Sequence, residues 1–263
     1  MPLDTALFNN GVPHSARIWN YWLGGKDCYE IDRQVGDQIV EANPQILDIA
    51  RAQRAFLVRT VEYLAREVGI RQFLDVGTGL PTANNTHEVA QRIAPETRIV
   101  YVDNDPIVLA HAEALLTSSS EGRTDYIDAD LHDPETILQG AAKTLDFTRP
   151  IALVLLGITA HVVDDTAYDL VGRLVEALPS GSFLVLCDDT EVLDPEGMRI
   201  MIEQWNEAGD NPRVNRSPEQ LARFFDGLEL LDPGLVSVSR WRPTSPDAEV
   251  LEVDDFGGVG RKL

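Results

Sequence analysis

The segment QFLDVGTGLP, residues 72–81, decides the fold of this chain. It begins as a short apolar run and ends in a turn that contains Gly77 and Gly79. A buried strand that runs into such a turn is typical of the first strand of an open α/β sheet, because glycine lets the backbone bend tightly and approach a ligand closely. Alone, the Gly-x-Gly pattern is weak evidence, since a structural turn that binds nothing has the same sequence.

Further apolar runs follow along the chain, namely RIVYVD at 98–103, TDYIDAD at 124–130, IALVLLG at 151–157 and SFLVLCD at 182–188. Their nearly unbroken hydrophobicity predicts strands that are buried on both faces of a parallel sheet. Between them lie helix starts with a capping carboxylate before proline, or with capping-box spacing. These starts are Asp105-Pro106, Asp133-Pro134, Asp194-Pro195, Asn85 with Glu88, and Ser217 with Gln220. The alternation predicts a doubly wound α/β sheet with right-handed crossovers.

The two ends of the chain follow other patterns. Residues 1–68 have helical periodicity only, with helices expected at 17–23, 27–41 and 44–66. We therefore divide the chain into an N-terminal helical cap, 1–68, and a Rossmann-like domain, 69–263, which form one structural unit. Near the C-terminus, 228–241 and 248–260 are expected to be extended and joined by a proline-rich turn. That pattern predicts a β-hairpin and a mixed sheet edge with one antiparallel strand.

The chain of 263 residues carries 43 Asp and Glu against 22 Lys and Arg, a formal net charge of −21. Such a surface repels phosphate groups, so nucleic acids and anionic membranes are poor candidates for partners. No apolar run approaches the roughly 20 residues that span a bilayer, and the first residues lack the pattern of a signal peptide. Cys28 and Cys187 are too few for a disulfide framework or a zinc site. We expect a cytoplasmic protein without a metal.

Acidic residues follow the next two predicted strands. Asp103 ends the second strand, where a carboxylate can accept both ribose hydroxyls of an adenine nucleoside. Asp105 already serves as the helix cap, so Asp103 is available for a ligand, and its pairing with the glycine turn is more specific than either feature alone. The third strand ends in Asp128-Ala129-Asp130-Leu131. Here Asp130 is the candidate acceptor for the adenine amino group, whereas Asp128 fits a loop carboxylate better.

Two adenine ligands fit the ribose acid, NAD and S-adenosylmethionine. A dinucleotide needs the third glycine of G-x-G-x-x-G for close approach of its pyrophosphate, and Thr82 stands at that position. S-adenosylmethionine has no phosphate and carries a sulfonium and an ammonium group. Carboxylates at Asp75, Asp103 and Asp130 suit these cations and would repel a pyrophosphate. The residues therefore favour S-adenosylmethionine.

Three longer motifs carry a family resemblance: RIWNYWLGGKD at 17–27, FLDVGTGLPTANNTHEVA at 73–90 and VYVDNDPIVLAHA at 100–112. Together they resemble the S-adenosyl methyltransferase family abundant in actinomycetes, long catalogued as a domain of unknown function. The resemblance covers nearly the whole chain. It implies the class I methyltransferase fold, with a seven-stranded sheet whose last strand is inserted antiparallel. It also implies a cofactor site built from Gly77, Thr78, Gly79, Asp103, Asn104 and Asp130, with Leu131 beside them.

One position departs from the usual D-x-G-x-G-x-G loop of that fold, because Pro81 replaces the third glycine. The family shares this departure, so we expect a stiffer loop that still binds the cofactor. Within the first motif, Tyr21 and Gly25 are predicted to belong to a lid over the cofactor, whereas Trp19 is expected to pack the cap onto the sheet.

Methyl transfer mainly requires that nucleophile and methyl group are held in line. If the acceptor is a hydroxyl, a general base helps by about 10²–10⁴-fold. His161, just past the fourth strand, is the best-placed candidate, although a structural role fits it equally well, and Asp188 and Asp189 come second. The sequence thus predicts a methyltransferase that acts on a small molecule. A non-catalytic S-adenosylmethionine-binding regulator and, less favoured, an NAD-dependent oxidoreductase stay as alternatives, and the acceptor, the methylated atom and the oligomeric state stay open.

Overall fold

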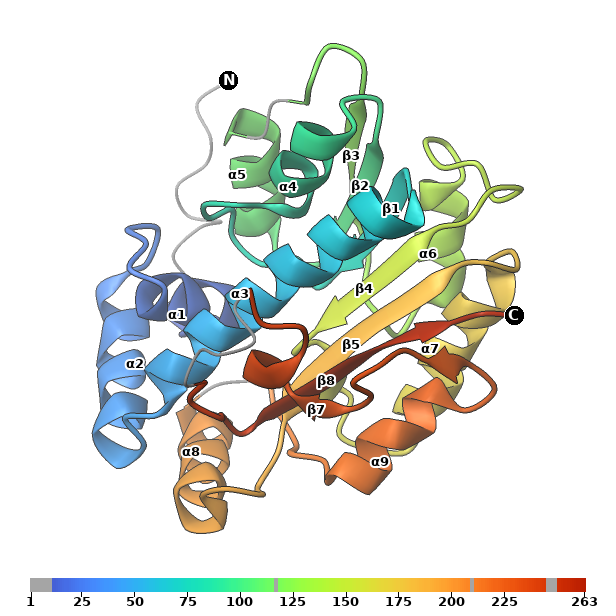
Figure 1. Cartoon of the computed structure of the whole chain (residues 1–263). Helices are drawn as coiled ribbons and strands as arrows, with labels where there is room; N and C mark the ends of the chain where they lie inside the picture. Colours follow the sequence, from blue (N-terminus) through green and yellow to red (C-terminus); the bar gives the residue numbers. More distant parts are fainter. Residues whose placement is uncertain (1–10, 116–117, 209–210, 245–249) are drawn as a thin grey trace.

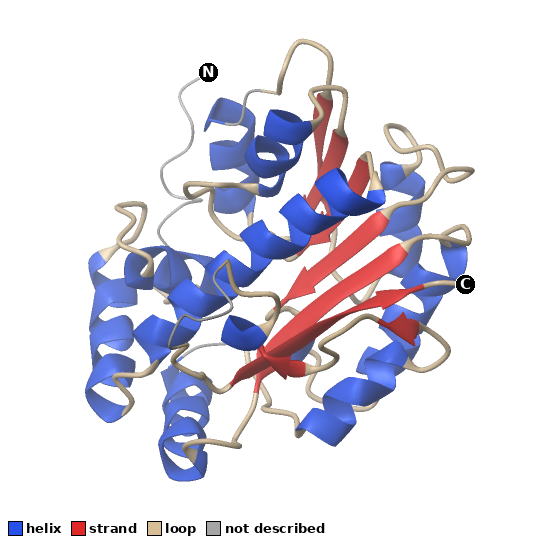
Figure 2. Cartoon of the chain, in the orientation of Figure 1, coloured by secondary structure: helices blue, strands red, loops and turns tan. Residues whose placement is uncertain are grey.

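A mostly parallel sheet of eight strands forms the centre of the molecule (Figure 1, Figure 2). The computed structural model describes residues 11–115, 118–208, 211–244 and 250–263. The strand order is β3-β2-β1-β4-β5-β8-β6, with β7 paired to β8. The first five strands are mutually parallel and coincide with the predicted apolar runs: β1 (Gln72–Val76), β2 (Arg98–Asp103), β3 (Arg123–Asp128), β4 (Ala152–Leu156) and β5 (Phe183–Asp189).

The C-terminal edge of the sheet is mixed, as predicted, but its hairpin is irregular. Strand β8 (Asp255–Arg261) runs antiparallel to β5 and also pairs with β6 (Glu229–Leu230) and β7 (Val236–Ser237). The first arm is therefore two short strands instead of one, because a turn closed by the Gly234 N–H donating to the Leu231 carbonyl interrupts it. Residues 245–249 of the predicted turn and second arm lie outside the described residues.

Helices cover both faces of the sheet, and the alternation of side chains along each strand separates two cores. Phe73 and the next residue, Leu74, belong to different hydrophobic clusters. The Phe73 cluster contains apolar residues of α1 (Ser15–Trp22), α2 (Glu30–Ala42), α3 (Ile46–Tyr63), α4 (Thr86–Ile93) and α8 (Pro195–Ala208). The Leu74 cluster contains residues of α6 (Pro134–Ala141), α7 (Thr166–Ala177) and α9 (Pro218–Ala222). Since α1–α3 share one core with the sheet, the N-terminal helices are packed onto the Rossmann-like part.

The predicted helix starts are confirmed in detail. Asn85 and Ser217 form capping boxes at α4 and α9, and Asp133 caps α6 by accepting a hydrogen bond from the Thr136 N–H. Asp105 accepts from the Ile107 N–H at 2.8 Å, at the start of α5 (Pro106–Leu115). In the described part of the chain, no helix combines the length and the apolar character needed to cross a bilayer.

Candidate functional site

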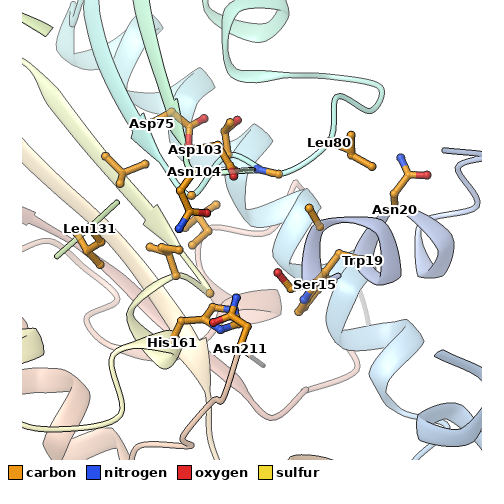
Figure 3. A pocket seen from close by; sticks show the side chains of 18 of the residues that line it. Ser15, Trp19, Asn20, Asp75, Leu80, Asp103, Asn104, Leu131, His161 and Asn211 are labelled. Atoms are coloured by element: carbon orange, nitrogen blue, oxygen red, sulfur yellow. Dashed lines mark hydrogen bonds between the residues drawn. The ribbon is translucent and has the colours of Figure 1, made fainter. Parts of the chain in front are cut away.

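A pocket opens at the carboxyl ends of β1, β2, β3 and β4, beneath α1 and α3 (Figure 3). In the close-up, Asp75, Asp103 and Asn104 lie on the sheet side, Trp19 and Asn20 of α1 lie across the pocket, and His161 lies near Asn211. The structure brings most of the predicted site residues together here. Those that line the pocket are Asp75, Gly77, Thr78, Gly79, Asp103, Asn104, Asp130, Leu131 and His161.

The glycine turn has a conformation that other residues tolerate poorly. Gly77 has φ +74° and Gly79 has φ +65°. A Cβ atom on Gly77 would lie 2.5 Å from Cγ1 of Ile158, whereas one on Gly79 would meet nothing within 4 Å. The turn is fixed to β2, because the Gly77 N–H donates to the Val102 carbonyl at 2.8 Å and the Gly79 N–H donates to Oδ2 of Asp103 at 2.9 Å.

Asp103 joins this turn to the start of α5. Its Oδ1 accepts a hydrogen bond from the Asp105 N–H at 3.0 Å, while Oδ2 accepts from Gly79. The side chain is half-buried and lines the pocket. Burial raises its pKa above the usual value, and the two backbone hydrogen bonds act against that rise. The carboxylate is therefore held in a single position with room for further hydrogen-bond donors from the pocket.

Asp75, at the end of β1, is buried more deeply. Its Oδ2 accepts a hydrogen bond from the Thr86 hydroxyl at 2.6 Å. Burial raises the pKa of Asp75 to about 6, although Thr86 and the nearby Arg54 lower it. A cation bound in the pocket would therefore stabilise the ionised form of Asp75, which burial disfavours.

Asn104, Asp130 and His132 form a hydrogen-bonded group at the ends of β2 and β3. The Asn104 amide donates to Oδ2 of Asp130 at 2.6 Å, and Oδ1 of Asp130 accepts from the His132 N–H at 2.8 Å. The His132 ring nitrogen lies 2.6 Å from the same oxygen. Burial acts to raise the pKa of Asp130, but these hydrogen bonds outweigh it and hold the pKa below its usual value. Asp130 is thus ionised and oriented, with the buried side chain of Leu131 next to it.

His161 lies on the 3-10 turn Thr159–His161 after β4. Its ring stands 6.2 Å from that of Trp205, and its buried Nδ1 has no hydrogen-bond partner within the described ranges. Burial, and after it the neighbouring Arg213, lower the pKa of His161 to about 3. The imidazole is therefore neutral at pH 7 and can accept a hydrogen bond, but it is a weak base.

The structure does not bring Tyr21 and Gly25 to the pocket. The Tyr21 hydroxyl donates to Oδ1 of Asp37 on α2 at 2.7 Å. Gly25 packs on Asn20, where a Cβ atom would lie 2.1 Å from Oδ1. The pocket is instead lined by another side of α1, which includes Trp19 and Asn20. Trp19 packs against the core that the cap shares with the sheet, as expected, and also lines the pocket.

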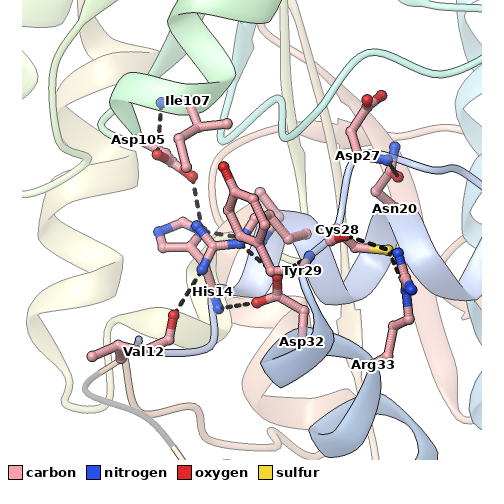
Figure 4. Close-up of polar contacts among 12 residues, drawn as sticks. Val12, His14, Asn20, Asp27, Cys28, Tyr29, Asp32, Arg33, Asp105 and Ile107 are labelled. Atoms are coloured by element: carbon pink, nitrogen blue, oxygen red, sulfur yellow. Dashed lines mark hydrogen bonds and ion pairs between the residues drawn. The ribbon is translucent and has the colours of Figure 1, made fainter. Parts of the chain in front are cut away.

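One ion pair and several polar contacts hold the start of α1 (Figure 4). Arg17 pairs with Asp32 of α2 at 2.7 Å, and both side chains are buried. The His14 N–H also donates to Asp32, at 2.9 Å, and the His14 ring lies 3.0 Å from Oδ2 of Asp105. Because the other oxygen of Asp105 caps α5, the start of α1 is tied directly to the segment that follows Asp103.

Sequence reasoning missed two polar residues of α3 that line the pocket, Gln53 and Arg54. Gln53 donates to Oδ2 of Asp255 at 3.0 Å, and Arg54 donates to the Ala83 carbonyl at 3.0 and 3.2 Å. The signal was present, because Gln53 interrupts the buried stripe of α3 four residues before Leu57. A polar residue inside such a stripe indicates a buried partner or a ligand.

The second-choice bases, Asp188 and Asp189, are fully buried and are not part of the pocket lining. Asp189 pairs with Arg213 at 2.9 Å, and Asp188 accepts from the Thr159 hydroxyl and lies 4.0 Å from Arg216. Burial raises the pKa of both carboxyls. They act as internal ion-pair partners in this conformation. The described residues also hold no group of three or more His, Cys, Asp or Glu side chains suited to a metal ion.

Comparisons with known proteins agree with this architecture. No curated protein matches the chain. A DUF574 family protein from Streptomyces avermitilis MA-4680 is 43% identical, with a TM-score of 0.93, over 97% of this chain and 99% of its own. A proposed methyltransferase from Thermobifida fusca YX is 36% identical, with a TM-score of 0.90, over 100% of this chain and 99% of its own. A S-adenosylmethionine-dependent methyltransferase from Anabaena variabilis ATCC 29413 shares only the fold, with 14% identity and a TM-score of 0.54 over 95% and 96% of the two chains.

The sequence itself matches the family described as S-adenosyl methyltransferase over residues 4–263, which is nearly its whole length. That match and the two similar structures agree with the resemblance carried by the three sequence motifs. The central sheet with its antiparallel insertion is the class I methyltransferase arrangement. The chain therefore belongs to the S-adenosyl methyltransferase family and is a S-adenosylmethionine-dependent methyltransferase.

Proposed function

We propose that this enzyme binds S-adenosylmethionine in the pocket at the ends of β1–β4 and methylates a small molecule held beneath α1. The observation that carries the proposal is the convergence of Asp75, Asp103 and Asp130 around one glycine turn in a single pocket. Three carboxylates suit a ligand that carries a sulfonium and an ammonium group. They would repel a pyrophosphate, so NAD fits this donor set poorly.

The ribose, the adenine and the ammonium group of the cofactor would each have a partner in the chain. Asp103 would accept hydrogen bonds from the ribose hydroxyls, since its position is fixed by Gly79 and Asp105. Asp130 and Asn104 would bind the polar edge of adenine, with Leu131 against its face. Asp75 would pair with the ammonium group. The bound cofactor supplies an electrophilic methyl group on its sulfonium, and the chain supplies its position.

The acceptor would occupy the part of the pocket near Trp19, His161 and Asn211. A small molecule fits this place because α1, held by the Arg17–Asp32 pair, covers the pocket. The net charge of −21 also argues against nucleic acid as the acceptor. Neutral His161 would accept a hydrogen bond from an O–H or N–H of the acceptor and orient its lone pair, which favours in-line transfer. With a pKa of about 3, it would contribute more by orientation than by proton abstraction.

Thermal unfolding with S-adenosylhomocysteine, S-adenosylmethionine and NAD tests the cofactor assignment. A ligand at 100 times its Kd stabilises the folded state by about 2.7 kcal/mol, so either adenosyl compound should raise Tm by several degrees. Stabilisation by NAD alone would overturn the proposal. Methyltransferase activity is tested with radiolabelled S-adenosylmethionine and a pool of metabolites. Formation of S-adenosylhomocysteine that depends on the pool would distinguish an enzyme from a regulator that only binds the cofactor.

A further inference from the structure

Arg54 stands at the end of the pocket where Asp75 lies. It is the only Lys or Arg among the residues that line the pocket in the described chain. Its Nε and Nη2 donate to the Ala83 carbonyl, and Nη2 also donates to Oδ1 of Asn85 at 3.0 Å. Nη1 takes part in none of these hydrogen bonds. The guanidinium is thus oriented by the loop after the glycine turn and keeps a donor for another partner.

A second polar group at the same end lacks a partner. The hydroxyl of Thr82, which also lines the pocket, is buried and makes no hydrogen bond with any described residue. Thr82 and Arg54 share a hydrogen-bond acceptor. The Thr82 N–H donates to Oδ1 of Asn85 at 3.0 Å, and Arg54 donates to the same oxygen. Leaving a buried hydroxyl unsatisfied costs about 1–3 kcal/mol, so this hydroxyl is expected to gain a partner when the pocket is filled.

The two donors lie beside an acid. Arg54 and Asp75 are close enough to influence each other electrostatically, and the ionised form of each is favoured by the other. A cation and an anion side by side in one pocket match a zwitterion, the charge pattern of a free α-amino acid group. The acidic residues of the pocket would repel the carboxylate of a ligand. Arg54 and Thr82 instead offer hydrogen-bond donors to it.

We propose that Arg54, assisted by the Thr82 hydroxyl, binds the carboxylate of the amino-acid part of the cofactor, while Asp75 binds its ammonium group. This inference rests on the proposed function. It assigns to α3, a helix of the N-terminal cap, the role of distinguishing S-adenosylmethionine and S-adenosylhomocysteine from adenosyl compounds without an amino-acid tail. The guanidinium suits this role, since its remaining donor, Nη1, can make a charge-assisted hydrogen bond to a carboxylate.

Calorimetric titration with two ligands tests the assignment. S-adenosylhomocysteine carries the amino-acid tail, and 5′-methylthioadenosine has the same adenosyl thioether without it. Arg54→Gln should weaken binding of S-adenosylhomocysteine by about 10- to 100-fold, the scale of a hydrogen bond to a charged group, and change binding of 5′-methylthioadenosine by less than about twofold. Thr82→Val removes only a hydroxyl without a protein partner, and should weaken S-adenosylhomocysteine alone by about 3- to 10-fold.

Arg51→Gln is the matched control, because Arg51 lies one turn earlier on α3, is exposed and, among the residues that the structure describes, forms an ion pair with Asp48 alone. It should leave both affinities unchanged. Equal S-adenosylhomocysteine affinity in wild type, Arg54→Gln and Thr82→Val would overturn the inference and leave the cofactor assignment intact. An equal loss of both ligands in Arg54→Gln would also overturn it, since Arg54 would then act through the loop. If the wild type binds neither ligand, the proposed function itself fails. Thr82→Val decides the matter if Arg54→Gln does not fold.

Discussion

Replacing Asp103 by alanine tests the ribose contact at the centre of the proposed site. Both carboxylate oxygens already accept a backbone hydrogen bond, from Asp105 at 3.0 Å and Gly79 at 2.9 Å, and each can accept a second one. Hydrogen bonds to a charged group contribute about 1.5–3 kcal/mol. We therefore expect Asp103→Ala to weaken S-adenosylhomocysteine binding by roughly 10- to 150-fold, measured by isothermal titration calorimetry.

The neighbouring strand offers a matched control. Asp128 is the register partner of Asp103 on β3, is exposed and does not line the pocket, so Asp128→Ala should leave the Kd within about twofold. Asp103→Asn keeps the size of the side chain and one acceptor oxygen, and should show a smaller loss than alanine. The free energy of unfolding of Asp103→Ala without ligand, compared with that of the wild type, shows how much the lost hydrogen bond to Gly79 destabilises the turn. A folded Asp103→Ala variant with the wild-type Kd would refute the ribose assignment.

Three further predictions concern the turn, the acid beneath it and the histidine. Gly77→Ala should destabilise the fold by about 2–5 kcal/mol, because alanine would adopt a left-handed conformation and its Cβ would collide with Ile158. Gly79→Ala has only the first of these costs and should destabilise the fold by about 1–2 kcal/mol. Equal losses of stability in urea unfolding would contradict this prediction. Because Asp75 has a pKa of about 6 and its ionised form would bind the ammonium group, the Kd of S-adenosylhomocysteine should rise about tenfold from pH 7 to pH 5, and Asp75→Asn should remove that dependence. An unchanged slope in the variant would exclude Asp75. His161→Ala should lower turnover and retain cofactor affinity; equal turnover would leave His161 with a structural role.

The sheet and the acids at its strand ends were predictable because their signals are local. Each central strand is an apolar run long enough to stand out, and a parallel sheet brings the ends of its strands to one edge. Asp103 and Asp130 therefore had to lie near Gly77 once the strands were identified. The hairpin was less predictable. Its first arm contains Pro233 and Gly234, whose turn breaks the pairing with β8 after two residues.

The face of α1 that lines the pocket could not be read from the sequence. The pocket residues Ala16, Trp19, Asn20 and Leu23 have spacing of one helical face, i, i+3, i+4 and i+7. Tyr21 is two residues from Trp19 and so faces another direction, toward Asp37 of α2. One face of α1 packs against α2 and another lines the pocket, and both faces carry aromatic residues. Only the docking of the helix decides which aromatic residue meets the ligand.

Two groups of acids at the carboxyl side of the sheet have different surroundings, and α3 contacts the residues of both. Asp75 and Asp103 reach the pocket, whereas Asp189 and Asp255 face each other across β5 and β8 and are fully buried. Asp255 accepts a hydrogen bond from Gln53, the residue before Arg54. Consecutive residues of α3 are thus anchored at two different places, Gln53 on Asp255 at the start of β8 and Arg54 on the loop after the glycine turn. In the proposed site, Asp255 would therefore support cofactor binding indirectly, because it anchors the helix that carries Arg54.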